Sequence, residues 1–339
     1  MATKAGARSA HAADAGALDL SIILPRWFAW GCIALTTAFL INNYLTHWRD
    51  WPGSEAFLNG GDGIALSLVQ AGLYVLAIVA AGAYVLNSRG RSLRPDTETI
   101  FAITAYIIRA SFWAVFLIGV TDMVVSFLRV EGLLPVLFGD KMAIDLGRST
   151  FRGLWVHFPM LVTGMAIAAW QRGLGFPWLA LLVVAAELLI VLTRFIFSYE
   201  QAFMADLVRF WYASLFLFAS AYTLLEEGHV RVDVLYSGFG ERTKGLVNAW
   251  GSVLLGISLC AVIIYYGMSS KSTVINGPLL IFETTQTGFG MYVKYWMAGF
   301  LGIFAVSMLI QFAGYFLEGM ADYRGEPGKR AIESEGILE

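Results

Sequence analysis

The stretch "FWYASLFLFASAYTLLEEGHVRVDVLYSGFGER", residues 210–242, is an apolar run that ends abruptly in a charged patch. Residues 210–225 carry no charged side chain, whereas residues 226–242 bring Glu, Arg and Asp in close succession, in a chain that is only 14% charged. An apolar helix can cross hydrocarbon, but a cluster of charges is too costly to remain there. The change at residue 226 therefore predicts the edge of a membrane, where a spanning helix ends.

The composition of the whole chain extends this conclusion. Of 339 residues, 58% are hydrophobic, which is more than one soluble core needs. Residues 63–88 and 245–270 contain no Asp, Glu, Lys or Arg. A transmembrane barrel would show segments of about ten residues with alternating polarity instead of such continuous runs. The sequence therefore predicts an all-α, polytopic membrane protein.

Charges and helix breakers divide the apolar sequence into spans. Four spans fall in a membrane extension at 27–176 and four in a second region at 177–320, between tails at 1–26 and 321–339. The first span is long enough to remain as an anchor rather than a cleaved signal peptide. The connection 129–153 contains "LLPVLF", which is apolar enough to lie on the bilayer as an interfacial segment. The eight predicted spans are 27–47, 64–87, 99–128, 154–171, 177–198, 207–225, 245–268 and 292–317.

The basic residues of the connections predict the orientation of these spans. With the amino terminus in the cytoplasm, thirteen of the 23 Lys and Arg residues fall on the cytoplasmic side and seven on the other, and three lie in or at spans. This excess predicts that both termini are cytoplasmic. The net charge of −2 favours no nucleic-acid partner.

Residues that could carry redox or metal chemistry are few. A membrane b-type haem needs two facing histidines, yet only His157 lies within a span. His229 and Asp233 are four apart and would share a helix face, but no obvious third and fourth metal ligands accompany them. Cys32 and Cys260 lie at different predicted depths, which predicts two free, buried thiols. We expect no cofactor, no metal site and no enzymatic activity; a quinone-linked redox anchor and a stand-alone carrier remain as alternatives.

Charged residues inside predicted spans are candidates for function by default. Arg109 and Asp122 are thirteen residues apart on one helix, about 20 Å along its axis, so they cannot pair with each other. Each needs a partner on another helix.

Two further pairs lie in the next spans. Glu187 and Arg194 are seven apart, which places them on one face about 10 Å from each other and fits either a subunit contact or an intrachain polar clamp. Asp206 and Arg209 open a span at i, i+3, where the acid favours the helix amino end and the arginine can reach the interface. We expect this pair to orient its helix.

The order of motifs from "LTRFIF" to "GHVRVD" resembles the small integral-membrane subunit of TRAP transporters, the tripartite ATP-independent periplasmic carriers. The resemblance covers about residues 177–320. It departs at Glu226 and Glu227, where a basic residue beside an acidic one is expected, and it assigns no role to residues 1–176. The matching positions are Arg194, Phe195, Asp206, Arg209, Gly228, His229, Val230, Arg231, Val232 and Asp233.

The resemblance implies a multi-pass protein of a bacterial inner membrane that works with two protein partners. A periplasmic binding protein would deliver an organic anion, and a large permease would move it with sodium, which would bind to that permease. The small subunit would brace the permease, in contact with membrane lipids. The residues proposed for subunit or lipid contact are Glu187, Arg194, Asp206, Arg209, Gly228, His229, Arg231 and Asp233.

Overall fold

The computed structural model describes residues 19–60, 63–172, 176–225, 234–285 and 290–329. Within these ranges the chain is helical and contains no strand, and eight of its helices are long and apolar enough to span a membrane. The predicted all-α, polytopic class is therefore confirmed. The spanning helices are α2 (Leu20–Trp48), α3 (Ile64–Asn87), α4 (Leu93–Val130), α6 to α7 (Ser149–Trp170), α8 (Phe176–Phe197), α9 (Ala202–Leu225), α10 to α11 (Glu241–Met268) and α13 (Lys294–Arg324).

Two of the spanning helices contain a π-helical turn, and short helices lie in the connections between spans. The fourth span consists of α6 (Ser149–Phe151), η3 (Arg152–His157) and α7 (Phe158–Trp170), in which η3 is the π turn. The seventh consists of α10 (Glu241–Gly251), the π turn η5 (Ser252–Ile257) and α11 (Ser258–Met268). The connecting helices are η2 (Ala56–Asn59), α5 (Leu134–Leu146), η4 (Tyr236–Gly238) and α12 (Asn276–Ile281).

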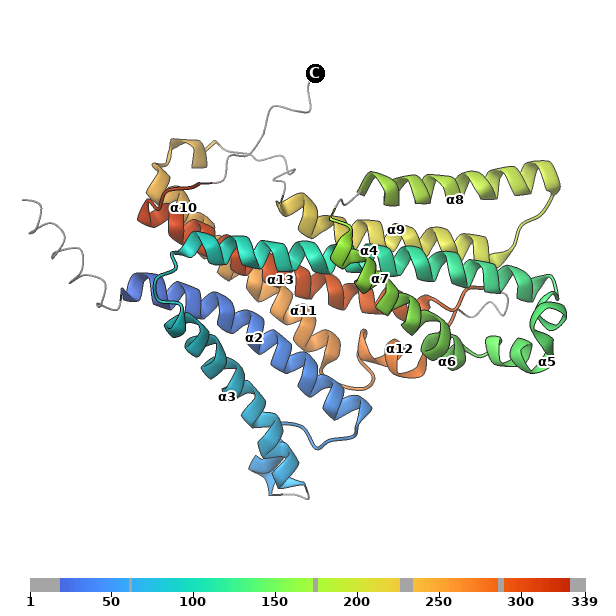
Figure 1. Cartoon of the computed structure of the whole chain (residues 1–339), viewed down its shortest axis with the longest axis horizontal. Helices are drawn as coiled ribbons and strands as arrows, with labels where there is room; N and C mark the ends of the chain where they lie inside the picture. The colour runs from blue at the N-terminus through green and yellow to red at the C-terminus, as the bar shows by residue number, and fades with distance from the viewer. Residues whose placement is uncertain (1–18, 61–62, 173–175, 226–233, 286–289, 330–339) are drawn as a thin grey trace, which may run out of the picture.

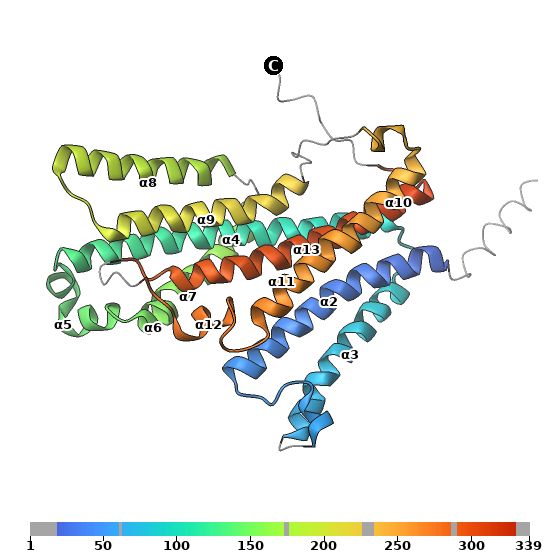
Figure 2. The same ribbon diagram turned by 180° about the vertical axis from the view of Figure 1, so that it is seen from behind.

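The long helices α4 and α13 lie side by side and form the centre of the molecule (Figure 1). Helices α7 and α9 pack on α4, whereas α2, α10 and α11 pack on α13. Helix α3 packs on α2, and α8 packs on α9 at the opposite margin (Figure 2). Because α4 precedes residue 176 and α13 follows it, the predicted extension and the second region share one core.

Glycines allow the central helices to approach closely. A Cβ atom on Gly245 of α10 would lie 2.6 Å from the carbonyl oxygen of Gly319 in α13, and one on Gly319 would lie 2.7 Å from the carbonyl oxygen of Gly245. On the other side of the core, a Cβ on Gly164 of α7 would lie 2.6 Å from the backbone nitrogen of Ala114 in α4. Small residues at such crossings provide the close van der Waals packing that associates helices in lipid.

The two ends of the described chain meet at one end of the molecule, where Arg324 Nη2 lies 3.0 Å from Asp19 Oδ2. Asp19 caps α2 and Arg324 ends α13. We call this the terminal end and the opposite one the distal end. The two ends lie on the same side, which agrees with an even number of spans. The cytoplasmic location of the terminal end stays a prediction.

Among the basic residues that were counted with the connections, two are fully buried inside helices, so their assignment to connections was wrong. Helix α2 begins at Leu20 rather than 27, so Arg26 belongs to it; Arg152 belongs to the π turn η3, and both side chains are fully buried. The connection that holds "LLPVLF" folds as α5, on which Val136 is 82% exposed. An apolar face of this kind is typical of the interfacial alternative for this segment.

Candidate functional site

A buried polar cluster near the distal end joins α4 to η3. Arg152 Nη1 donates to Asp122 Oδ1 at 2.9 Å, and His157 Nε2 lies 3.1 Å from the same oxygen. The backbone N–H of Tyr292 donates to Asp122 Oδ2 at 2.8 Å. Asp122, Arg152 and His157 are fully buried. The prediction that Asp122 finds its partner on another helix is confirmed.

The π turn explains why Arg152 and His157 both reach Asp122. Residues five apart on an α-helix would lie about 140° from each other, because each residue turns the helix by about 100°. The i to i+5 hydrogen bonds of a π turn bring such residues onto the same face. The turn therefore supplies two donors to one carboxylate.

The partners of His157 define its tautomer. Trp296 Nε1 lies 3.2 Å from His157 Nδ1, and an indole N–H can only donate. Nδ1 is therefore an acceptor, and the ring proton lies on Nε2, which donates to Asp122. Tyr295 Oη also lies 2.6 Å from Nδ1. Both ring nitrogens contact protein groups, so this histidine is not free to ligate haem iron as the redox-anchor alternative requires.

The same cluster continues toward the start of α13. Arg129 Nη2 donates to the carbonyl oxygen of Gly290 at 2.8 Å, and Arg129 also donates to Tyr292 Oη. Tyr292 Oη donates to the carbonyl oxygen of Gly147 at 2.9 Å, and the Arg152 guanidinium lies 4.3 Å from the Tyr292 ring centroid. The segment that enters α13 is thus held by residues of the extension.

A second buried cluster ties the helices together at the terminal end. Arg26 Nε of α2 donates to Asp96 Oδ2 of α4 at 2.7 Å, and Trp30 Nε1 donates to the same oxygen at 2.9 Å. Arg94 Nη2 of α4 donates to Asp322 Oδ1 of α13 at 2.7 Å. The core is therefore clamped by ion pairs at both ends.

Sequence reasoning missed most of these groups. Arg26 and Arg152 lie beside apolar runs, where basic residues indicate orientation, and no sequence pattern singles out Asp96. Asp122 was the available signal, because a carboxylate inside a span requires a cation or donors nearby. Which basic residue pairs with Asp122 depends on how the neighbouring helices are rotated and aligned, which the sequence of one span does not show.

The predicted pair Glu187 and Arg194 lies on the outside of α8. Both side chains are exposed, and Arg194 Nε lies 3.4 Å from Glu200 Oε2 in the link to α9. Glu187 forms no ion pair with any residue that the structure describes. Within the described residues, the intrachain clamp between Glu187 and a cation is therefore not formed.

The pair Asp206 and Arg209 divides between the interior and the surface. Helix α9 begins at Ala202, so Asp206 lies in its second turn, buried, where it accepts from the backbone N–H of Met291 at 3.0 Å and from Thr285 Oγ1 at 3.3 Å. Arg209 Nη1 lies 3.6 Å from Asp206 Oδ1, and its side chain is 71% exposed. Asp206 is thus an intrachain link, whereas Arg209 is available at the surface.

The remaining candidate residues are the charge Arg109, the two cysteines and the motif residues after α9. Arg109 is half-buried, and its Nε has no hydrogen-bond partner among the described residues. Cys32 and Cys260 are free, as predicted, but Cys32 is only half-buried. No group of three or more His, Cys, Asp or Glu that could hold a metal occurs in the part of the chain that the structure describes. The motif residues Gly228, His229, Arg231 and Asp233 lie outside the described residues.

Residues 179–322 match a family described as tripartite ATP-independent periplasmic transporters, DctQ component. The matched region runs from α8 to α13 and confirms the resemblance drawn from the motifs. No curated protein and no solved structure matches the chain closely enough to be compared with it.

Proposed function

Because residues 179–322 match the DctQ component of tripartite ATP-independent periplasmic transporters, we propose that this chain braces the large permease of such a transporter. The permease would take up an organic anion with sodium, after a periplasmic binding protein delivers the anion. In this proposal the chain lies in a bacterial inner membrane, catalyses no reaction and leaves the sodium sites to the permease.

Glu187 is the observation that carries the bracing proposal. It lies near the middle of α8 among exposed apolar side chains such as Val184, Leu188 and Val191. A carboxylate that faces hydrocarbon without a partner costs several kcal/mol. A polar or cationic group from the large permease would remove that cost. The exposed face of α8 is therefore the proposed contact surface.

The buried clusters support the same function mechanically. A subunit that braces a moving partner has to keep its own helices at fixed depth and angle. The Arg26–Asp96 and Asp122–Arg152 pairs connect helices at opposite ends of the core, and Arg94–Asp322 connects α4 to α13. The extension thereby contributes α4, one of the two central helices of the brace.

Substitution of Glu187 tests the contact. We expect Glu187→Lys to lower recovery of the large permease with the tagged chain in mild detergent and to lower sodium-driven uptake in proteoliposomes to a similar extent. Glu187→Gln should have a smaller effect, because an amide keeps hydrogen-bonding capacity. Glu98→Lys, at an exposed carboxylate on α4, is the matched control. Normal recovery and uptake with Glu187→Lys would exclude this residue from the interface.

Arg231 and Asp233 extend the proposal to the charged patch that follows α9. We propose that they hold the inner end of the sixth span against the large permease or lipid headgroups, because the patch is too polar to enter hydrocarbon. Arg231→Glu should weaken recovery of the complex or uptake. If both stay at the wild-type level, the patch only marks the membrane edge.

A further inference from the structure

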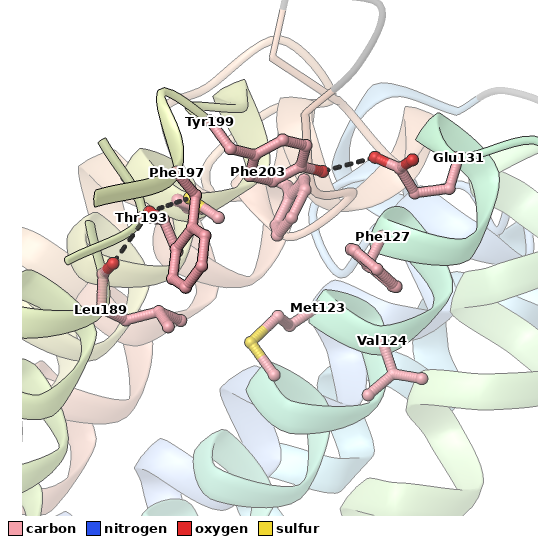
Figure 3. Close-up of a pocket in the computed structure, with 10 residues that line it drawn as sticks. Met123, Val124, Phe127, Glu131, Leu189, Thr193, Phe197, Tyr199 and Phe203 are labelled. Carbon is pink, nitrogen blue, oxygen red and sulfur yellow. Dashed lines mark hydrogen bonds between the residues drawn. The ribbon is translucent and has the colours of Figure 1, made fainter. Parts of the chain in front are cut away.

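Helix α8 packs on α9 and stands apart from α4, so the three helices enclose a crevice near the distal end (Figure 3). Its volume is about 580 Å³. The crevice joins the extension to the matched region, because α4 forms one wall and α8 the other. It lies apart from Glu187, which is absent from its lining.

The walls of the crevice are apolar. Helix α4 contributes Met123, Val124 and Phe127, and α8 contributes Leu189 and Phe197. Val124 and Leu189 are 45% and 40% exposed, which shows that the crevice opens sideways at the depth of the spanning helices. An apolar space of this kind is a poor site for water, which needs two to four polar partners.

A polar bridge closes the crevice toward the distal end. Tyr199 Oη, in the link between α8 and α9, donates to Glu131 Oε1 at 2.6 Å (Figure 3). Burial, followed by the hydrogen bond to Glu131, raises the pKa of Tyr199 to about 12, so the phenol stays a donor at physiological pH. Tyrosine is typical of the level of the lipid headgroups.

The dimensions of the crevice favour an acyl chain over a partner helix as its occupant. A partner helix is about 10 Å wide with its side chains and could not continue past the Tyr199–Glu131 bridge. The volume lies within the range of about 300–1,000 Å³ that is typical of small-ligand sites. A single acyl chain is narrow, apolar and supplied by the surrounding bilayer, so it fits both the walls and the closed end.

The charges at the rim point to the headgroup. Glu131 is exposed and uses only one carboxylate oxygen for Tyr199 among the described hydrogen bonds. Glu200, next to Tyr199, is paired with the exposed guanidinium of Arg194. Of these charged residues only Glu131 belongs to the crevice lining, so the rim complements the ammonium of a headgroup. We propose that the crevice holds one acyl chain of a phospholipid whose ammonium headgroup contacts Glu131.

Lipid retention tests this proposal on the full chain in complex with its large permease. After purification in mild detergent, native mass spectrometry should show phosphatidylethanolamine bound to the wild-type chain. Leu189→Trp and Val124→Trp fill the crevice and should each abolish most of this retention, because the indole occupies the volume that the acyl chain would fill. Leu76→Trp, at an exposed position of α3 away from the crevice, should retain the lipid.

Each result decides the proposal. Equal retention in wild type, Leu189→Trp and Val124→Trp would overturn it, provided that the variants show the wild-type melting temperature; if one variant does not fold, the other carries the test. Glu131→Lys should shift retention from phosphatidylethanolamine toward phosphatidylglycerol, and an unchanged ratio would overturn the headgroup assignment. A crosslink between a Val124→Cys variant and the large permease would show a protein occupant and overturn the lipid assignment.

Discussion

Asp122 is fully buried and contacts three residues from two different segments of the chain. Arg152 and His157 reach it from the π turn η3, and the backbone of Tyr292 reaches it from the segment before α13. A buried charge that loses its only counter-charge is strongly destabilising, whereas replacing both partners by apolar groups is often tolerated. The effect on stability should therefore differ between replacing Asp122 alone and replacing Asp122 together with Arg152.

Asp122→Ala should lower the free energy of unfolding by about 3–5 kcal/mol, because the Arg152 guanidinium then stays buried without a carboxylate. The double variant Asp122→Leu with Arg152→Met should recover part of that loss. Thermal unfolding of the purified chain in detergent measures both effects. If the double variant is less stable than Asp122→Ala, the ion pair contributes more than its desolvation costs and this interpretation is wrong.

At the scale of elements, the crossing of α4 and α9 depends on one glycine. A Cβ atom on Gly119 would lie 2.4 Å from the indole nitrogen of Trp211, which is buried and has no hydrogen-bond partner in the described structure. Trp211 belongs to the core cluster between these helices. The ring therefore rests on the α4 backbone, and the approach of α9 is set by the missing side chain.

Gly119→Ala should destabilise the chain by about 1–3 kcal/mol, since overpacking forces the ring or the helix to move. Gly72→Ala in α3 is the matched control, because a Cβ there meets no atom within 4 Å. It should be neutral or slightly stabilising, as alanine favours helix over glycine by about 1 kcal/mol. Melting temperatures of the two variants distinguish a close helix contact from a general effect of glycine removal.

At the scale of the whole molecule, α4 and α13 form one core that crosses the boundary between the extension and the matched region. The Asp19–Arg324 pair holds the start of α2 against the end of α13. Whichever side of the membrane carries one described end therefore carries the other. The orientation of the whole molecule in the membrane is therefore fixed once the side of either end is known.

Labelling with an impermeant thiol reagent tests that choice in intact cells, in a variant with Cys32 and Cys260 replaced. A cysteine at Ser9 or Gly336 should be protected, while one at Ser272, in the link between α11 and α12, should react. Ser272 lies beside Lys271, which pairs with the exposed carboxylate of Asp50. Reaction at the tails with protection at Ser272 would invert the topology.

The sequence by itself determined the eight spans and the membrane class, because the length and apolarity needed to cross hydrocarbon are properties of each segment alone. It also indicated which family the second region resembles, through motifs that are local in the chain. The tertiary structure alone decided that Arg26 and Arg152 are buried, and that Asp122 meets a backbone amide 170 residues away. Such pairings depend on how separate helices are rotated against one another. At η3 they also depend on a π turn that changes which residues share a face. The hydropathy of a single segment encodes neither the rotation nor the π turn.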